Sequence, residues 1–289
     1  MMEALKQFQK KNNFLKVFFL FSFIFFCSLQ SSLAKVFSDF LELNGSFTQG
    51  GLLFGKTNSK NKVFFNTKKI FVNGNGDFIL AIGRDEKLEN LIVIEGLKKK
   101  ETHKIKISKR KYEIQRIDGL PKNKVTPNAE ELKRIKKESK KIKNSKSIFL
   151  NKTLYKRGFI WPVEGIVTGK YGNQRILNGK TRRPHYGLDI AAASGTKIIS
   201  PTDAEVILTM EDTFFNGKMI ILNHGLGLNS IYSHLKKIYV KEGEKIKKGD
   251  LLAEVGSTGR STGPHLYWRI NVFNVAIDPE LLLLDQPEF

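Results

Sequence analysis

Arg183-Pro184-His185-Tyr186-Gly187-Leu188-Asp189-Ile190 places a histidine and an aspartate four positions apart. Pro184 and Gly187 disfavour a helix, so we expect the two side chains to meet through an irregular turn that leads into a strand. A neutral imidazole and a carboxylate are both good Zn²⁺ ligands. The stretch therefore predicts a metal-binding corner on a β-rich domain.

Two further histidines lie in strand-like surroundings downstream. Ser230–Leu235 places His234 at the end of a β run, and a Gly-rich loop, residues 256–263, leads to His265 at the start of another strand. Residues i and i+2 of a strand share a face, so we expect His265 and Tyr267 to point into the same cleft. The Gly-rich stretches 169–180 and 256–263 are expected to frame a groove.

The first half of the chain is typical of short strands and one basic helix. The expected strands are Phe37–Leu43, Phe47–Phe54, Lys62–Phe65, Ile70–Val72, Phe78–Ile82, Leu91–Ile94 and an alternating run over Lys104–Ile114. Asn and Gly separate them, which favours a small sandwich or barrel-like β domain. Arg116–Pro121 is typical of a turn.

The segment 98–146 carries 19 Lys or Arg against 6 Asp or Glu. Thr126 as N-cap, Pro127 in the first position and two glutamates in the first turn predict a helix that ends near Lys146. Leu132, Ile135 and Ile142 form a narrow apolar stripe. Two interpretations stay open: a solvated linker helix that packs this stripe on a neighbour, or an electrostatic tether to an acidic surface.

The first 34 residues have the layout of a secretory signal peptide. A lysine-bearing start is followed by the apolar run Val17–Leu29, and small residues precede a cut after Ala34; an uncleaved anchor is the alternative. The single cysteine, Cys27, lies in this run, which excludes a disulfide framework and cysteine catalysis. Outside the cytoplasm, the formal net charge of +21 favours anionic envelope surfaces, and no nucleic-acid-binding motif appears.

The motifs from Trp161 to about Ile270 resemble the lysostaphin/LytM-type zinc metalloendopeptidase domain. The matching runs are Trp161–Gly165, Tyr171-Gly172 with Arg175, His185 to Asp189, Gly195-Thr196, Ala204–Val206, Asn223–Gly227, Tyr232–Leu235, Val240–Asp250 and Gly256–Leu266. The resemblance implies that His185 and Asp189 bind Zn²⁺, that His265 acts as base beside the metal, and that His234 stabilises the oxyanion. It assigns His224 to hydrogen bonding without metal duty.

The third metal ligand of that family is the second histidine of a His-x-His motif, and here the position holds Tyr267. Three interpretations are open. Tyr267 ligates as a phenolate, or a nearby carboxylate or a water anchored by Tyr267 replaces the imidazole, or the site is degenerate. Burying four unpaired polar groups without chemistry would cost free energy, which favours retained metal chemistry.

The predicted fold is mainly β: an antiparallel C-terminal domain and a small N-terminal β domain, joined by a basic segment with one helix. The predicted parts are residues 1–34 (signal peptide or anchor), 35–120 (β domain), 121–158 (basic helical linker) and 159–289 (metallopeptidase domain with its tail). The length of 289 residues leaves room for two modest domains.

The predicted function is an exported, zinc-dependent endopeptidase that cleaves peptidoglycan stem peptides or cross-bridges in the periplasm or cell envelope. The alternative is a degenerate module that binds the wall or activates a separate cell-wall amidase. Peptidoglycan is the expected partner. An amidase, the division machinery and an anionic envelope surface stay open as further partners, and nucleic acid is not expected.

Overall fold

Alternation of apolar and polar residues builds two small sheets in the first part of the chain. The computed structural model describes residues 35–284, so the predicted signal peptide lies outside the described residues. One sheet has the order β1 (Lys35–Ser38), β2 (Leu41–Gly45), β3 (Leu52–Lys56), β6 (Asp77–Ala81), and the other has the order β5 (Lys68–Ile70), β4 (Lys62–Phe65), β7 (Glu89–Glu95), β8 (Lys100–Lys106). Leu43 and Phe78 of the first sheet share a buried cluster with Ile92 and Ile94 of the second. The predicted small sandwich is confirmed.

Several predicted strand boundaries were wrong because turns occupy the ends of the apolar runs. Phe37–Leu43 is split into β1 and β2 by a turn at Asp39 and Phe40. Phe47–Phe54 becomes a strand only from Leu52, since Gly51 N donates to Thr48 O at 2.9 Å and closes a turn. The run Lys104–Ile114 stays in a strand only to Lys106, and Arg116 lies in a strand rather than a turn.

The basic helix α3 (Ala129–Lys146) follows a short helix α2 (Lys122–Val125). Its N-cap is Asn128, not Thr126 as predicted: Asn128 Oδ1 accepts from Glu131 N at 2.9 Å, while Asn128 N donates to Glu131 Oε2 at 2.8 Å. The reciprocal pair satisfies two helix-end groups that Thr126 does not reach. The predicted end at Lys146 is confirmed.

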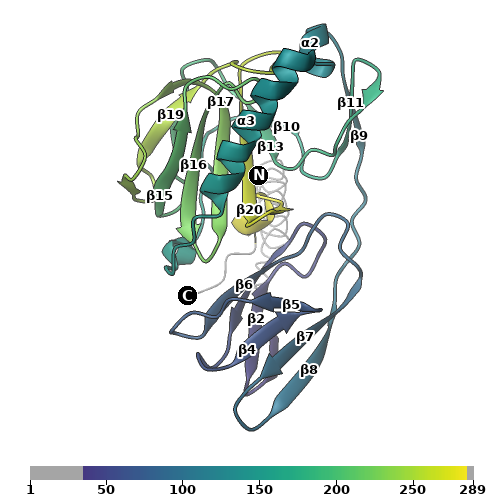
Figure 1. Ribbon diagram of the computed structural model, residues 1–289, viewed down its shortest axis with the longest axis vertical. Coiled ribbons are helices and arrows are strands. Elements are labelled where there is room, and N and C mark those ends of the chain that lie inside the picture. The colour runs from purple at the N-terminus through teal and green to yellow at the C-terminus, as the bar shows by residue number, and fades with distance from the viewer. Residues whose placement is uncertain (1–34, 285–289) are drawn as a thin grey trace, which may run out of the picture. The chain divides into compact units, whose positions relative to one another are not determined.

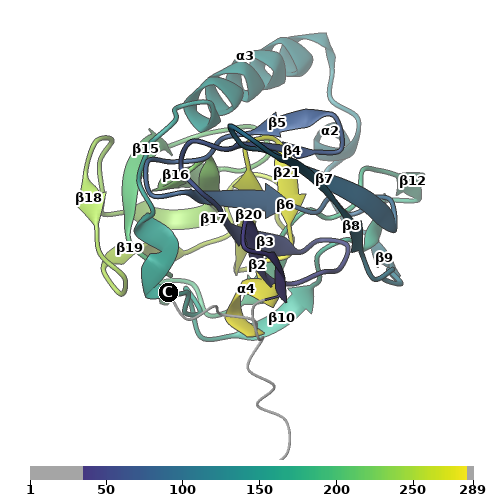
Figure 2. The same cartoon turned by 90° about the horizontal axis from the view of Figure 1, so that it is seen from below.

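α3 lies over β15 (Ala204–Met210) and β16 (Lys218–Gly225) of the large sheet, as Figures 1 and 2 both show. Ile142 packs against an apolar cluster that includes Leu208 and Met219, whereas Leu132 is 54% exposed. The packed stripe is therefore narrower than the sequence suggested. Among residues 35–284, no helix is long and apolar enough to cross a membrane.

The second half of the chain forms a ten-stranded sheet whose strand pairs are antiparallel. Its main order is β10 (Ile166–Gly169), β13 (Leu188–Ala191), β20 (His265–Val272), β17 (Leu228–Ile238), β16 (Lys218–Gly225), β15 (Ala204–Met210), β18 (Lys245–Ile246), with β14 (Lys197–Ile199), β19 (Leu251–Val255) and β21 (Val275–Ile277) attached. In β20, Leu266, Trp268 and Ile270 are fully buried. His265 and Tyr267 consequently lie on the opposite face, as the two-residue period predicts.

A three-stranded sheet borders this domain. It has the order β12 (Lys180–Thr181), β11 (Gln174–Leu177), β9 (Ile114–Ile117), and β9 runs parallel to β11. The remaining short helices are η1 (Leu154–Arg157) and α4 (Leu281–Leu284). Leu52 and Phe54 of β3 belong to the same buried cluster as Tyr155 and Phe159. The division of the chain at residues 120 and 158 stays a prediction.

His224, near the end of β16, is fully buried and satisfied on both ring nitrogens. Nδ1–H donates to Asp203 O at 2.9 Å, and Nε2 accepts from Ser230 Oγ at 2.7 Å. The expectation that His224 serves hydrogen bonding is confirmed. Burial lowers its pKa from 6.5 to about 4, against the opposing effect of the Asp203 carbonyl.

Because the pKa of His224 is lower in the folded than in the unfolded chain, acid should favour unfolding between pH 6.5 and pH 4. The contribution is at most ~1.4 kcal/mol per pH unit in this window. In urea titrations with EDTA, His224→Gln should make the loss of unfolding free energy between pH 7 and pH 4.5 shallower than in the wild type. His103→Gln is the control, and an equal slope for wild type and His224→Gln would contradict this assignment.

Candidate functional site

His185 and Asp189 meet as the sequence predicts, through an irregular segment that enters β13. His185 N donates to Asn173 O at 2.8 Å and Gly172 N donates to His185 O at 2.7 Å, which fixes this segment against the chain before β11. His185 Nε2 lies 3.4 Å from Asp189 Oδ1. Both atoms are buried, and within the described part of the chain neither has a hydrogen-bond partner.

The charge states of His185 and Asp189 favour the binding of a cation between them. Burial alone would raise the pKa of Asp189, but His185 and the Arg175 guanidinium outweigh burial and lower it. Burial lowers the pKa of His185 to about 3, so this ring is neutral near pH 7. A carboxylate oxygen and a nitrogen of a neutral imidazole thus lie close together in a buried position. Such unpaired buried atoms are costly, and a bound Zn²⁺ would satisfy both.

Arg175 and Gly169 hold the Asp189 carboxylate in place. Arg175 Nη2 donates to Asp189 Oδ2, which leaves Oδ1 free to face His185. On the other side, a Cβ added at Gly169 would lie 2.5 Å from Oδ2 and 3.0 Å from both Cβ and Cγ of Asp189. Only glycine at this position of β10 lets the carboxylate occupy its site.

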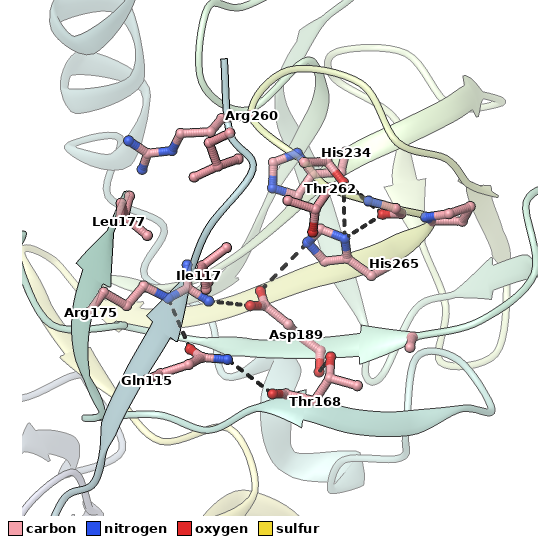
Figure 3. A pocket seen from close by; sticks show the side chains of 15 residues that line it. Gln115, Ile117, Thr168, Arg175, Leu177, Asp189, His234, Arg260, Thr262 and His265 are labelled. Carbon is pink, nitrogen blue, oxygen red and sulfur yellow. Dashed lines mark hydrogen bonds and ion pairs between the residues drawn. The ribbon is translucent and has the colours of Figure 1, made fainter. Parts of the chain in front are cut away.

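His265 and His234 face Asp189 from β20 and β17 (Figure 3). His265 Nε2 lies 3.7 Å from Asp189 Oδ1, and the ring centroids of His265 and His234 are 4.7 Å apart. Their Nδ1 atoms contact the carbonyl oxygens of Gly263, at 2.9 Å, and Thr258, at 2.7 Å. A carbonyl only accepts, so each Nδ1 carries the proton and each Nε2 presents a lone pair to the cleft.

The sequence predicted that His234 lies at the end of a strand. In the structure it lies inside β17 instead. Its φ of 66° is in the left-handed region that a side chain rarely adopts, and its N donates to Asn216 O at 2.8 Å. Backbone strain of this kind turns the imidazole out of the alternation of the strand and toward His265. Burial lowers the pKa of His234 to about 4.

Tyr267 is paired with Asp189 in the β13–β20 register. Its ring centroid lies 5.3 Å from that of His185, and burial raises the pKa of its phenol. Tyr267 and His265 share a face of β20, and they line adjoining cavities of about 620 Å³ and about 340 Å³ that have four lining residues in common. That the two side chains point into one cleft stays a prediction.

Among the described residues 35–284, no group of three His, Cys, Asp or Glu side chains is arranged to hold a metal ion. The three interpretations of the third ligand therefore stay open. His185 Nε2 and Asp189 Oδ1 are the preformed ligand atoms, and the role of Tyr267 stays a prediction.

Gln115 is a site residue that the sequence did not indicate, and Arg175 was indicated only as part of a motif match. Gln115 Nε2 donates to Thr168 O at 3.0 Å, and Arg175 Nε donates to Gln115 Oε1 at 3.2 Å (Figure 3). Gln115 reaches the site because β9 pairs with β11, from a distance of about 60 residues in the sequence. No local pattern around Gln115 signals such a pairing.

Comparison with known proteins places similar sequences on the second half of the chain. The family model described as Peptidase family M23 matches residues 183–279. An uncharacterized metalloprotease of Haemophilus influenzae is 38% identical over 97 residues, which are 34% of this chain and 20% of that protein. The peptidoglycan DD-endopeptidase ShyB of Vibrio cholerae is 37% identical over 95 residues, 33% of this chain and 22% of that protein.

The DD-carboxypeptidase/endopeptidase Mpg of Neisseria meningitidis is 32% identical over 108 residues, 37% of this chain and 25% of that protein. The chain thus spans about a fifth to a quarter of the length of these curated relatives. Among solved structures, a putative peptidase M23 from Pseudomonas aeruginosa has a TM-score of 0.62 at 25% identity and covers 84% of this chain and 96% of that chain. The predicted mainly β fold is confirmed.

We expect the full chain to bind Zn²⁺ and Gly169→Ala to weaken binding, because a methyl group at residue 169 displaces the Asp189 carboxylate. Loss of a residue that positions a metal ligand typically reduces metal affinity by about 10–100-fold. Titration with a competing zinc chelator measures the change, and His185→Ala should lose more. Gly74→Ala is the matched control, since a Cβ there has nothing within 4 Å. Equal affinities for Gly169→Ala and Gly74→Ala would contradict the placement of Asp189.

Tyr267→His should raise the affinity for zinc, because residue 267 lies directly across the strand pair from Asp189 and beside His185. An imidazole there would complete a three-ligand set. The same chelator competition should show an increase of at least about tenfold. Tyr239→His, on an exposed tyrosine, serves as control. An affinity equal to that of wild type would show that residue 267 does not face the metal.

Proposed function

We propose that the protein is a zinc-dependent peptidase that hydrolyses peptide bonds of peptidoglycan, because residues 183–279 match the model of Peptidase family M23. The observation that carries the proposal is the buried pair of unpaired atoms, His185 Nε2 and Asp189 Oδ1, with two imidazoles facing it. The similar proteins ShyB and Mpg, both named as endopeptidases, support the substrate class.

His185 and Asp189 would hold the zinc ion, with Tyr267 as the proposed third contact. Bound zinc supplies a Lewis acid that polarises the scissile carbonyl and lowers the pKa of water to about 7. Arg175 keeps Asp189 ionised and directs Oδ1 toward the metal position. The neutral ring of His185 leaves its Nε2 lone pair available.

His265 is the proposed general base. Because its Nδ1–H is held by Gly263 O, its Nε2 is free to take the proton of the attacking water. The ring then delivers this proton to the amine nitrogen that leaves when the peptide C–N bond breaks. His234, 4.7 Å away between centroids, is proposed to face the carbonyl oxygen. Thr258 O holds its Nδ1–H, so Nε2 donates to the oxyanion only from a protonated ring, which the lowered pKa of the free protein opposes at neutral pH; protonation of His234 would have to accompany the charge that develops on the oxyanion.

Export to the periplasm or cell envelope is part of the proposal. It is supported by the signal-peptide pattern of residues 1–34 and by the basic segment, whose 19 Lys or Arg favour retention on an anionic wall. A module that only activates an amidase is not favoured, because four polar groups converge in one buried site. The amidase and the division machinery stay predicted partners.

Zinc-loaded protein should release soluble fragments from dye-labelled peptidoglycan, and EDTA should stop the release. His265→Ala should lower the rate by about 10²–10⁴-fold, since it removes the proposed base. The control is His103→Ala, a histidine of β8 that contacts Glu101. Release that occurs only after addition of a separate amidase would favour the activator instead, and equal rates for His265→Ala and wild type would remove His265 from the mechanism.

A further inference from the structure

A cavity of about 620 Å³ next to the site is lined by five arginines: Arg175, Arg182, Arg183, Arg260 and Arg269. No aspartate or glutamate is among the described residues that line it. We call this cavity the arginine pocket. Its other walls come from the site itself, through His185 and Tyr267, and from α3, through Ile135 and Ser139.

The guanidinium groups are oriented by neutral partners. Arg182 Nη2 donates to Val125 O at 2.7 Å, and Arg269 Nε donates to Asn271 Oδ1 at 2.7 Å. The Arg260 Cζ atom lies 4.3 Å from the ring centroid of Phe215. Within residues 35–284, Arg175 is the one member of the five that forms an ion pair, with Asp189. Each guanidinium has five N–H donors, so several remain available to a ligand.

Positive charge accumulated in this way is unfavourable unless an anion joins it. Burial, together with the charges of Arg175 and Arg182, lowers the pKa of Arg260 to about 10. Arg183 is exposed and adds a further charge at the mouth of the pocket. Planar guanidinium forks match the two oxygens of a carboxylate, and paired charged hydrogen bonds of this kind are among the strongest that proteins make.

The arginine pocket adjoins the cavity that Asp189 and His265 line. Both are lined by Arg175, Leu177, His234 and Arg260. A carboxylate bound between the arginines therefore belongs to the same peptide as the bond that faces His265. A carboxylate is the anionic group that an unmodified peptide carries, either at its C-terminus or on an acidic side chain.

We propose that the arginine pocket binds a free carboxylate of the peptide that is hydrolysed, so that the preferred substrate carries an unamidated acidic group near the scissile bond. The inference rests on the proposed peptidase function. It assigns Arg182, Arg183 and Arg260 to substrate selection, a role separate from metal binding and from proton transfer.

The test uses synthetic cross-linked stem peptides in which each free carboxylate is converted in turn to a primary amide. The zinc-loaded full chain should show, for one amidation, a kcat/KM about 10–100-fold lower than for the parent peptide, the range expected for lost charged hydrogen bonds. Arg182→Gln and Arg183→Gln should bring the ratio of the two kcat/KM values toward one. Arg183 is exposed, so its replacement tests the proposal without loss of a buried contact.

Arg157→Gln is the matched control, because it removes an arginine that is 58% exposed and lies outside the pocket. It should keep the wild-type ratio. Equal kcat/KM values for the parent peptide and for each amidated peptide would overturn the proposal, and so would a ratio that Arg182→Gln and Arg183→Gln leave unchanged.

Binding separates this proposal from the proposed function. After the metal is stripped with EDTA and the EDTA is removed by dialysis, calorimetry on the full chain should show tighter binding of the parent peptide than of the critical amide. If the protein binds the parent peptide more tightly than the amide but the zinc-loaded protein cleaves neither peptide, the carboxylate site is supported and the peptidase function is rejected. Tighter binding of inorganic phosphate than of the parent peptide would reject the carboxylate as ligand.

Discussion

The buried carboxylate of Asp189 is the constraint on which the rest of the site depends. One oxygen is occupied by Arg175, and the other faces His185 and His265 without a hydrogen bond among the described residues. An ionised group at this depth would be prohibitively unfavourable alone. Arg175 compensates the charge of the Asp189 carboxylate, and Gly169 provides the space for it. The Oδ1 atom is left for a cation to bind. Every functional assignment to His185, His234 and His265 follows from the position of that oxygen.

Local sequence patterns predicted the parts of this arrangement that are local. The alternation in β20 placed His265 and Tyr267 on one face, and Pro184 with Gly187 indicated the irregular approach to Asp189. The N-cap at Asn128 was missed because Thr126-Pro127 offered a competing cap signal two residues earlier. The left-handed backbone of His234 was missed as well. It depends on hydrogen bonds to Asn216 and Thr258, and the residues next to His234 in the sequence do not indicate these bonds.

Contacts between distant segments account for what the sequence did not reveal. Gln115 enters the site only through the parallel pairing of β9 with β11, and the five arginines of the arginine pocket come from separate segments: 175–183, the loop at 260 and β20. Charge counting located basic residues in the segment 98–146 instead. The proposed carboxylate site therefore adds a second role for positive charge, beside the proposed catalytic groups, to the wall retention proposed for that segment.

Anomalous diffraction at the zinc edge, on crystals of the full chain grown with Zn²⁺, tests the central claim most directly. The account predicts an anomalous peak within about 2.0–2.2 Å of both His185 Nε2 and Asp189 Oδ1. Zinc found elsewhere, with these two atoms still unpaired, would contradict it.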